Sequence, residues 1–511
     1  MSTDQPQAPR WPAALAGIVT GLTGLAVALA VTSLLRQRAN PVQSVSEMVR
    51  DITPGPLAEK LIHLVGTADK PLLLTGVTLG LLGLSAWAGI LARRQLLAGA
   101  AVFLVMSVIA GVAVMTRHGA TSAGLLPVVM GAAAWVVTLT YLRPLQSRSE
   151  SLPYDVVGAT DRRGFLIRVG GVAAAAAVVG VSSRFLSRSR RAVEAARSQL
   201  RLPVTRGTVP AGAGLDVKGL YPWQTPNDVF YRIDTALVVP TIKPSEWELR
   251  IHGMVDREIT IQYDDLVARE LTEAWVTLCC VSNPIGGHLI GNAWWSGVRI
   301  ADLLAEAGVH ADADAVLQTS QDGWTCGTPI KALTDDRNAL LALAMNGKAL
   351  PLEHGFPVRM VVPGLYGFVS ATKWVVDLEV SRFDKFDAYW TTRSWSEQAP
   401  IKTQSRIDVP RGGRAMAGDV TVAGVAWAQH TGIEKVEVRL DGGPWEQVEL
   451  ARVPGVDTWV QWSGTVEASP GIHTLAVRAT DLTGTTQTPV ETAVAPDGAS
   501  GWHAIEFTAD G

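Results

Sequence analysis

The amino-acid sequence predicts an N-terminal bundle of transmembrane α-helices, followed by an α+β domain and an immunoglobulin-like β-sandwich. Long apolar stretches fill the chain before about residue 185, strands and helical pieces mix over residues 202–397, and residues 398–511 are nearly pure β-structure. A chain of 511 residues is also too long for one ordinary hydrophobic core, so several domains are expected.

The apolar stretches cover residues 11–35, 71–91, 96–115, 123–142 and 165–181. A helix needs about 20 apolar residues to cross the hydrocarbon core of a bilayer, and the four stretches within residues 1–150 reach this length. No acidic or basic residue interrupts the centre of any stretch, whereas a path for protons or ions usually needs one. We therefore expect this region to anchor the chain in membrane lipid, or to dock an electron partner, and not to transport.

Residues 151–201 contain the fifth apolar stretch, which has an unusual start. Arg162 and Arg163 precede Phe165 and Leu166, and an Ala/Gly-rich run follows. This order resembles a twin-arginine export signal placed in mid-chain, although paired arginines also flank ordinary membrane helices. The charged, helix-prone stretch 188–201 is interpreted as a juxtamembrane linker.

The arginines of the membrane half predict its orientation. If the N-terminus is cytoplasmic, the inner loops hold most of these arginines: Arg93, Arg94, Arg143, Arg148, Arg162, Arg163 and Arg168. This agrees with the positive-inside rule, although Arg36 and Arg38 fall on the outer side. Five spans then place everything after about residue 187 outside. The sequence predicts a multi-pass protein of the cell membrane with an extracytoplasmic soluble half.

In the soluble half, two regions differ in their patterns. Residues 202–397 contain short strand-like runs and two helical pieces, predicted at 300–307 and 338–345. Residues 398–511 contain alternating runs at 418–427, 435–440, 458–464 and 473–479, separated by Gly/Pro-rich turns. Short alternating strands with turn residues between them predict the β-sandwich.

Charge and cysteine content limit the classes of function. The formal net charge is −3 and the soluble half has no basic tract, so no nucleic-acid partner is expected. The three cysteines, Cys279, Cys280 and Cys326, cannot form a disulfide framework. Adjacent cysteines also rarely pair with each other, because disulfide geometry fits them poorly. At least one thiol is therefore free.

The strongest local signal surrounds Cys280. An apolar strand ends at this cysteine, and Asn283, Gly286, Gly287 and His288 follow closely. A soft thiolate at a strand end suits either a soft metal or a nucleophilic role. A Cys–His hydrolase and a merely buried thiol are the alternatives, and spacing alone leaves the choice open.

Four motifs in order resemble the sulfite oxidase family of molybdenum enzymes. The run VTLCCVSN at 276–283 resembles its metal-ligand segment, and NDVFYRIDT at 227–235 resembles its pterin-contacting segment. The run EHGFPVRMVVPG at 353–364 resembles its phosphate-binding stretch, and LYGFVSATKW at 365–374 resembles the turn that follows. The C-terminal region resembles the family's dimerisation domain. The resemblance spans roughly residues 205–500 and excludes the membrane half.

This resemblance implies a molybdenum–molybdopterin cofactor, with Cys280 as the single protein ligand of the metal and Cys279 as a bystander. His354, Arg359 and Lys373 would form a cationic pocket for the terminal phosphate of the pterin. The remaining residues implied to contact the cofactor are Asn227, Phe230, Tyr231, Asp234, Thr235, Asn283, His288, Ser320, Asp322, Ser370 and Thr372.

The sequence also departs from the family at the substrate side. Sulfite oxidases have an Arg-Asn-His run where this chain has Ile233, Asp234 and Thr235, so Arg232, our candidate catalytic arginine, stands one place away. No arginine lies near residues 429–431, where a second one is expected. Tyr389 is the candidate active-site tyrosine, with packing between domains as the alternative role. Binding of a small dianion usually requires guanidinium groups in fixed positions, so sulfite is a doubtful substrate.

The sequence thus predicts an extracytoplasmic oxidoreductase that performs two-electron oxo-transfer on a small oxyanion or an S/N-oxide. Electrons would be exchanged with a separate carrier, a quinone or a cytochrome. No haem is expected, because His63 and His118 are not paired across spans as bis-histidine ligation requires. A homodimer is compatible with the C-terminal resemblance. The alternative function is a cell-surface binding protein with a non-catalytic domain of this family.

Overall fold

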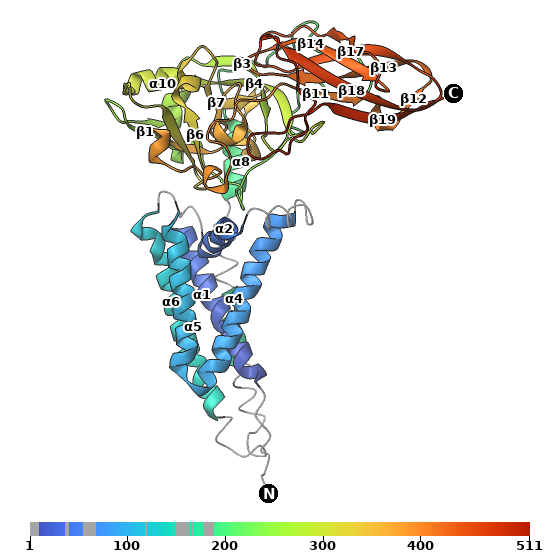
Figure 1. Ribbon diagram of the computed structural model, residues 1–511. Helices are drawn as coiled ribbons and strands as arrows, with labels where there is room; N and C mark the ends of the chain where they lie inside the picture. The colour runs from blue at the N-terminus through green and yellow to red at the C-terminus, as the bar shows by residue number, and fades with distance from the viewer. Residues whose placement is uncertain are drawn as a thin grey trace. The chain divides into compact units, whose positions relative to one another are not determined.

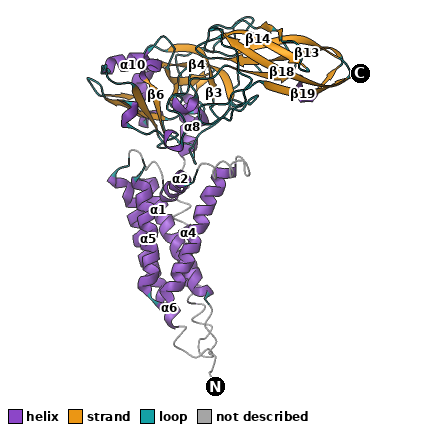
Figure 2. Ribbon diagram, in the orientation of Figure 1, coloured by secondary structure: helices purple, strands orange, loops and turns teal. Residues whose placement is uncertain are grey.

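The computed structural model describes residues 10–35, 40–54, 68–117, 120–148, 164, 167–174, 176–177 and 189–511. The chain forms two compact units, Met1–Ala192 and Val193–Gly511. The described part of the first unit is helical, and the second unit consists mainly of strands and loops (Figures 1 and 2).

The first unit is built from long apolar helices. They are α1 (Trp11–Leu34), α4 (Asp69–Arg94), α5 (Leu96–Met115) and α6 (Leu126–Arg148), joined by a shorter helix α2 (Pro41–Ile52) and a 3-10 turn (Ser122–Leu125). Four stretches are long and apolar enough to cross a membrane: Trp11–Leu34, Asp69–Arg94, Leu96–Met115 and Ser122–Leu142. The four predicted apolar spans of residues 1–150 are therefore confirmed as helices.

Small residues let these helices approach closely. A Cβ atom on Gly17 of α1 would lie 2.9 Å from the Cα of Gly89 on α4, and one on Gly24 would lie 2.7 Å from the carbonyl oxygen of Gly131 on α6. Glycine removes these clashes, as is common where helices pack in lipid. The sequence places no charge at the centre of any of the four helices.

A group of charged side chains lies beside α2. Arg117, just after α5, lies 3.3 Å from Glu47 and 3.1 Å from Asp51. Asn40 caps α2 by accepting a hydrogen bond from the backbone N–H of Gln43 at 2.9 Å. This cluster ties α2 to the end of α5.

Part of the predicted fifth span, including its start and its end, lies outside the described residues, as do Arg162, Arg163, His63 and His118. Of the described part, Val169 packs with Ala16, Val19 and Leu142. The twin-arginine interpretation therefore stays a prediction.

The first half of the second unit contains two sheets. One has the strand order β2-β1-β10-β5-β6, and the other has the order β3-β4-β7-β8 with β9 also paired to β7. The strands are β1 (Glu248–Gly253), β2 (Ile259–Gln262), β3 (Thr272–Cys279), β4 (Ile290–Arg299), β5 (Ala315–Ser320), β6 (Thr325–Pro329), β7 (Leu340–Met345), β8 (Lys348–Ala349), β9 (Arg359–Val361) and β10 (Val375–Ser381). Short helices connect them: α9 (Tyr263–Val267), α10 (Ile300–Ala307) and α11 (Ile330–Thr334).

The two helical predictions for this half had opposite outcomes. Residues 300–307 form α10 as predicted, with Gly308 in the left-handed conformation ending the helix. Residues 338–345 were predicted as helix, which is wrong: Leu340–Met345 form the fully buried strand β7. A short apolar run buried on both faces has no periodicity that separates strand from helix.

The stretch interpreted as a linker forms helix α8 (Ser189–Gln199). Val193 is completely buried in a cluster with Phe230, Val276 and Trp295, and Arg197 donates a hydrogen bond to the carbonyl oxygen of Ala349 at 3.2 Å. Most of this helix is therefore part of the second unit, which begins at Val193 and not near residue 202.

The C-terminal region, residues 398–511, consists of two packed sheets. Their orders are β11-β13-β17-β16 and β12-β19-β18-β14-β15. The strands are β11 (Gln404–Val409), β12 (Arg414–Met416), β13 (Gly418–Trp427), β14 (Ile433–Leu440), β15 (Glu446–Gln447), β16 (Glu449–Leu450), β17 (Val460–Ala468), β18 (Gly471–Asp481) and β19 (His503–Asp510). Val422 of one sheet and Val438, Leu475 and Phe507 of the other share a core.

This C-terminal region is not a loosely tethered module. Val425, Trp427 and Trp459 belong to the large core of the preceding half. The indole N–H groups of Trp223 and Trp459 each donate to the other's carbonyl oxygen, at 3.2 and 2.9 Å. The two halves of the second unit therefore bury apolar surface against each other, and such burial makes the dominant favourable contribution to the free energy of folding.

Candidate active site

The two adjacent cysteines face different surroundings. Cys279 ends β3, is 1% exposed and belongs to the large core, whereas Cys280 is 8% exposed and lies outside every apolar cluster of the described residues. Successive side chains of an extended strand point to opposite faces. All three cysteines are free thiols. Cys280 is therefore the cysteine available to a ligand.

The surroundings of Cys280 keep its thiol protonated in the absence of a metal ion or other cation. Burial raises the pKa of its thiol, while hydrogen bonding by Ser282 and the charge of Lys373 oppose the rise. Burial also raises the pKa of Cys279 well above its usual range. A buried thiol stays protonated until a cation or metal replaces the proton.

The loop after Cys280 closes back on itself. The N–H of Cys280 donates to the carbonyl oxygen of Leu289 at 2.9 Å, and the N–H of Leu289 donates to Oδ1 of Asn283 at 2.8 Å. Asn283 is 4% exposed, and its Nδ2 has no hydrogen-bond partner among the described residues. Such an orphaned buried donor points to a missing acceptor.

Arg359, at the start of β9, is a buried cation that pairs with no carboxylate among the described residues. It is 4% exposed and donates to the carbonyl oxygens of His354 and Met360, both at 3.2 Å. Its guanidinium also lies 5.1 Å from the ring centre of Trp295. Burial lowers its pKa to about 10. Carbonyl dipoles compensate a buried charge only in part, so this site suits an anion.

Lys373 is the second buried cation, and it has one acidic partner. Its Nζ lies 3.1 Å from Asp234 and donates to the carbonyl oxygen of Ile233 at 3.0 Å. Burial lowers the pKa of Lys373 to about 8, against the opposing effect of Asp234. Asp234 also pairs with Arg232 at 2.9 Å. The side chain of Arg232 is 41% exposed, so this arginine is a half-exposed ion-pair partner of Asp234.

His354 has a definite tautomer. Its Nε2 lies 3.1 Å from the carbonyl oxygen of Asn227, which can only accept, so Nε2 carries the proton. Burial, followed by the charges of Arg359 and Lys373, lowers the pKa of His354 to about 4. The ring is therefore neutral at pH 7, and its buried Nδ1 has no partner among the described residues.

Phe230 and Tyr231 line the same place. Their rings stack with centroids 5.2 Å apart, and Phe230 lies edge-on to His354 at 5.6 Å. Burial raises the pKa of Tyr231, and the charges of Cys280 and Cys279 raise it further, so Tyr231 lies beside the cysteine pair. Gly291 of β4 makes room for Phe230, since a Cβ there would lie 2.7 Å from the ring.

The other predicted cofactor residues occupy different environments. Ser320 ends β5 with its Oγ buried and without a partner in the described part of the chain. Thr372 Oγ1 donates to Gln318 at 2.5 Å, and Ser370 Oγ donates to the carbonyl oxygen of Tyr366 at 3.0 Å. Asp322 lies in the turn after β5, and Thr235 follows Asp234 directly.

Two predicted residues have contacts away from the buried cations. The N–H of Tyr389 donates to Thr325 Oγ1 at 3.1 Å, and its ring lies 3.8 Å from the guanidinium of Arg393. His288 is exposed and stacks on Tyr221 with centroids 6.4 Å apart. Burial and the charge of Arg406 lower the pKa of His288.

Three further residues near the cysteines and the loop after them were not expected from the sequence: Tyr366, Arg406 and His503. Burial and the charge of Cys279 raise the pKa of Tyr366, so this ring also lies near the cysteines. Arg406 is 1% exposed and donates to the carbonyl oxygen of Gly287 at 2.8 Å. Tyr366 lies inside the quoted run 365–374, but nothing local to Arg406 or His503 signals their contact with the Cys280 loop.

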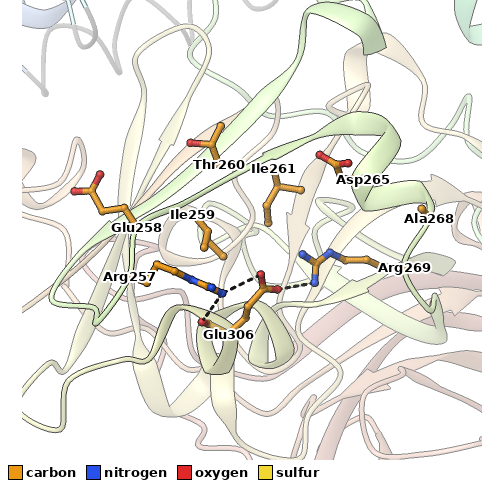
Figure 3. A pocket seen from close by; sticks show the side chains of 9 residues that line it. All are labelled: Arg257, Glu258, Ile259, Thr260, Ile261, Asp265, Ala268, Arg269 and Glu306. Carbon is orange, nitrogen blue, oxygen red and sulfur yellow. Dashed lines mark hydrogen bonds and ion pairs between the residues drawn. The ribbon is translucent and has the colours of Figure 1, made fainter.

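A separate surface hollow of about 600 Å³ lies beside β2 and the end of α10 (Figure 3). Arg257 and Arg269 both pair with Glu306 there, at 3.5 and 2.8 Å. None of the predicted site residues lines it. Both of its arginines pair with Glu306, and its lining has no cysteine, histidine or serine, so we assign it no catalytic role.

The residues around Cys280 fit a large anionic cofactor. Of the buried cations Arg359 and Lys373, only Lys373 pairs with a carboxylate among the described residues, and this carboxylate, Asp234, is shared with Arg232. Three buried polar atoms without partners lie on residues that the sequence had singled out: Asn283 Nδ2, Ser320 Oγ and His354 Nδ1. A pterin phosphate would supply the missing charge and acceptors.

Comparison with known proteins points the same way. The family model described as "Oxidoreductase molybdopterin binding domain" matches residues 236–390. Human mitochondrial sulfite oxidase is 30% identical over 271 residues, which cover 44% of this chain and 49% of the relative. The uncharacterized oxidoreductase YuiH of Bacillus subtilis is 33% identical over 146 residues, 29% of this chain and 70% of the relative. The chain spans about half the length of the mammalian relatives it matches.

A solved structure shares the fold. The sulfane dehydrogenase SoxCD from Paracoccus pantotrophus superposes with a TM-score of 0.50 at 23% identity, covering 57% of this chain and 82% of that chain. The family model and these relatives define the class of the second unit: it contains a molybdopterin-binding domain of the oxidoreductase type. The chain belongs to the sulfite oxidase family, which confirms the resemblance of the four motifs.

Proposed function

We propose that this chain is a membrane-anchored, extracytoplasmic enzyme that performs two-electron oxo-transfer on a small oxyanion or an S/N-oxide. The observation that carries the proposal is that a free thiol, Cys280, and the buried cations Arg359 and Lys373 lie in one site. A binding protein has no need of a thiol and incompletely compensated cations in the same buried place, because each costs free energy of folding.

In this proposal each residue has a definite task toward the molybdenum cofactor. Cys280 supplies the protein sulfur, and Ser282 hydrogen-bonds to it. Arg359 and Lys373 hold the terminal phosphate, with His354 beside them. Asn283 and Ser320 offer their free polar atoms to the pterin. When bound, the cofactor supplies the oxo-transfer chemistry, while the protein orients it and excludes water.

Tyr231 is a further hydrogen-bond donor beside the sulfur. Burial and the neighbouring cysteines raise its pKa, so its hydroxyl keeps the proton at neutral pH and can donate a hydrogen bond. Tyr389 keeps its assignment as the candidate active-site tyrosine at the substrate mouth, with packing as the alternative. Variants of the two tyrosines separate these roles, because only the residue that meets substrate changes kcat/KM without changing cofactor content.

The substrate is proposed to carry little charge. Arg232 is already paired with Asp234 and is half exposed, so it is a poor fixed partner for a dianion. A neutral S/N-oxide or a monoanion avoids placing two negative charges beside Asp234. A screen of sulfite against sulfoxides and N-oxides decides the matter, and faster turnover of sulfite would contradict this choice.

Location and partners extend the proposal. The four apolar helices and the arginine distribution favour a multi-pass membrane protein with its second unit outside the cytoplasm, exported through the twin-arginine motif. A quinone or cytochrome would exchange electrons with the site, and the C-terminal region would act as an immunoglobulin-like dimerisation domain. Protease accessibility of residues 189–511 in intact cells tests the orientation, and full protection would contradict it.

The deciding experiment is a metal analysis of the full chain, purified in detergent from a host that makes molybdopterin. We expect near-stoichiometric molybdenum in the unaltered protein and in the control Cys279→Ala, which removes the neighbouring sulfur from the core. Cys280→Ser should lose the metal. A metal-free unaltered protein would support the binding-protein alternative, and metal retained in Cys280→Ser would remove the proposed ligand.

A further inference from the structure

The loop that follows Cys280 is held from outside by the C-terminal region. Three successive residues of the loop, Ile285, Gly286 and Gly287, contact that region, although more than 110 residues separate them from it along the chain. This contact concerns how the loop after Cys280 is held in place. It is a separate question from which cofactor the loop binds.

The first contact is made by Arg406 of β11. Its Nη1 donates to the carbonyl oxygen of Gly287 at 2.8 Å, while its Nε lies 2.7 Å from Asp408. Arg406 and Asp408 have side chains only 1% and 6% exposed. A buried guanidinium fixed by its own carboxylate is a rigid donor. The carbonyl of Gly287 is therefore held in one position.

The second set of contacts comes from residues 498–503. A Cβ atom on Gly286 would lie 2.2 Å from the ring of His503, and one on Gly501 would lie 2.7 Å from Cδ1 of Ile285. A Cβ atom on Gly498 would lie 2.6 Å from the hydroxyl of Tyr366, the tyrosine near the cysteines. Gly498 and Gly501 have φ values of +100° and +126°, which only glycine adopts easily.

His503 is itself fixed in orientation. Its Nδ1 accepts a hydrogen bond at 3.0 Å from the N–H of Ile407, which is the residue after Arg406. The ring thus cannot turn away from Gly286 without losing this bond. Arg406 and His503 hold two consecutive loop residues from one side, and the loop closes on Cys280 through Leu289 and Asn283.

We infer that Arg406, Gly498, Gly501 and His503 form a clamp, the C-terminal clamp, that positions the Cys280 sulfur for its ligand. The C-terminal region then has a task in the site besides any role in assembly, and Arg406 and His503 are positioning residues. The inference rests on Cys280 being the ligand proposed above. Its test does not, because it measures the loop in protein that has no cofactor.

The test is site-resolved thiol labelling of the full chain, purified in detergent from a host that cannot make molybdopterin. Iodoacetamide is added, and mass spectrometry follows the alkylation of Cys280, Cys279 and Cys326 separately. The main variant is Arg406→Gln with Asp408→Asn, which removes both charges together and leaves no lone buried ion. We expect Cys280 to react about tenfold faster, because the loop opens locally more often.

The other two cysteines report on global folding. Cys279 and Cys326 are each 1% exposed, so they stay protected unless the core itself opens. A rise confined to Cys280 supports the clamp. An equal rise at all three thiols shows general unfolding and overturns the inference, as does an unchanged rate at Cys280 in the double variant.

Matched variants sharpen the result. Arg406→Lys keeps one donor for the Gly287 carbonyl and should return most of the protection. His503→Ala should accelerate Cys280 by a smaller factor. The controls are Arg414→Gln, which removes an exposed arginine–aspartate pair of the same region, and His473→Ala, which removes a histidine bonded to Asp441. Acceleration of Cys280 in either control as large as in the clamp variants would also overturn the inference.

Discussion

The two ends of the candidate site are built on different principles. At the cation end, Arg359 and Lys373 are buried, and among the described residues only Lys373 pairs with a carboxylate, Asp234, which Arg232 shares, so the cofactor-free protein holds positive charge that is not fully compensated. At the sulfur end, Cys280 is an uncharged thiol, and a distant region fixes its loop. The cation end attracts an anionic cofactor but lowers the folding stability of the cofactor-free protein. The sulfur end fixes the position of the Cys280 side chain. Different substitutions should therefore separate the two contributions.

Removing charge at the cation end should have the largest effect. We expect Arg359→Met to weaken cofactor retention by on the order of 3 kcal/mol, about a hundredfold, because a buried charge-assisted contact is lost. The same substitution should leave the melting temperature of the cofactor-free protein unchanged or higher, since a poorly compensated buried charge disappears.

Metal content and thermal unfolding, measured on the same preparations, check this prediction. The control is Arg250→Met, which removes an arginine whose side chain is half exposed and should change neither quantity. If Arg359→Met destabilised the cofactor-free protein as strongly as it reduced metal content, the guanidinium would be a structural element and the contrast between the two ends would fail.

Acid should test both ends through their histidines. The pKa is lowered to about 4 in His354 at the cation end and in His503 at the sulfur end, in both cases by burial first. The ordinary value is about 6.5, so the unfolded chain takes up these protons first as the pH falls. The free energy of unfolding should therefore be highest above about pH 6.5 and fall toward pH 4, by up to roughly 1.4 kcal/mol per pH unit and per histidine.

Denaturant unfolding of the cofactor-free chain at several pH values measures this slope. His354→Gln and His503→Gln should each flatten it. Loading with cofactor should reduce only the part of the slope that is due to His354, because the phosphate would lie beside His354 and favour its protonated form. His503 would gain no such neighbour, so its part of the slope should not change. Equal slopes in the loaded and cofactor-free proteins would contradict the placement of His354 beside the phosphate.

The smallest expected effect concerns the support of the cation end. Thr372 Oγ1 donates to Gln318 and lies 3.3 Å from Cys326 Sγ. Thr372→Val orphans the buried Gln318 oxygen and should cost about 1–3 kcal/mol of folding stability, with a severalfold loss of metal. Thr372→Ser keeps the hydroxyl and should behave nearly as the unaltered protein in both measurements. A serine variant as damaged as the valine one would show that the methyl group matters instead.

Local patterns predicted the local parts of this molecule well. The run 418–427 forms β13 with the predicted bounds, and 300–307 forms α10, because alternation and helical periodicity record which face is buried. Strand β7 was misread because burial on both faces erases the period. The strand pattern that ends at the cysteines likewise let the sequence assign different roles to Cys279 and Cys280, since adjacent residues of a strand face opposite sides.

Contacts that join distant segments could not be predicted in the same way. Asp234 and Lys373 meet across 139 residues, and Arg406 reaches Gly287 across 119 residues. Neither pair leaves a trace in the composition of its own segment. The four motifs named the residues around the cofactor because they are contiguous runs, while the C-terminal clamp is assembled from single residues that only the folded chain brings together.

The burial of Val193 has a practical consequence for anyone who wants a water-soluble form of the enzyme. A truncation that starts near residue 200 would delete this side chain and the Arg197 hydrogen bond, and would leave a void behind Phe230 and Trp295. Voids of this kind cost stability in proportion to their volume. The cut should fall before Ser189, so that the whole of α8 travels with the enzyme.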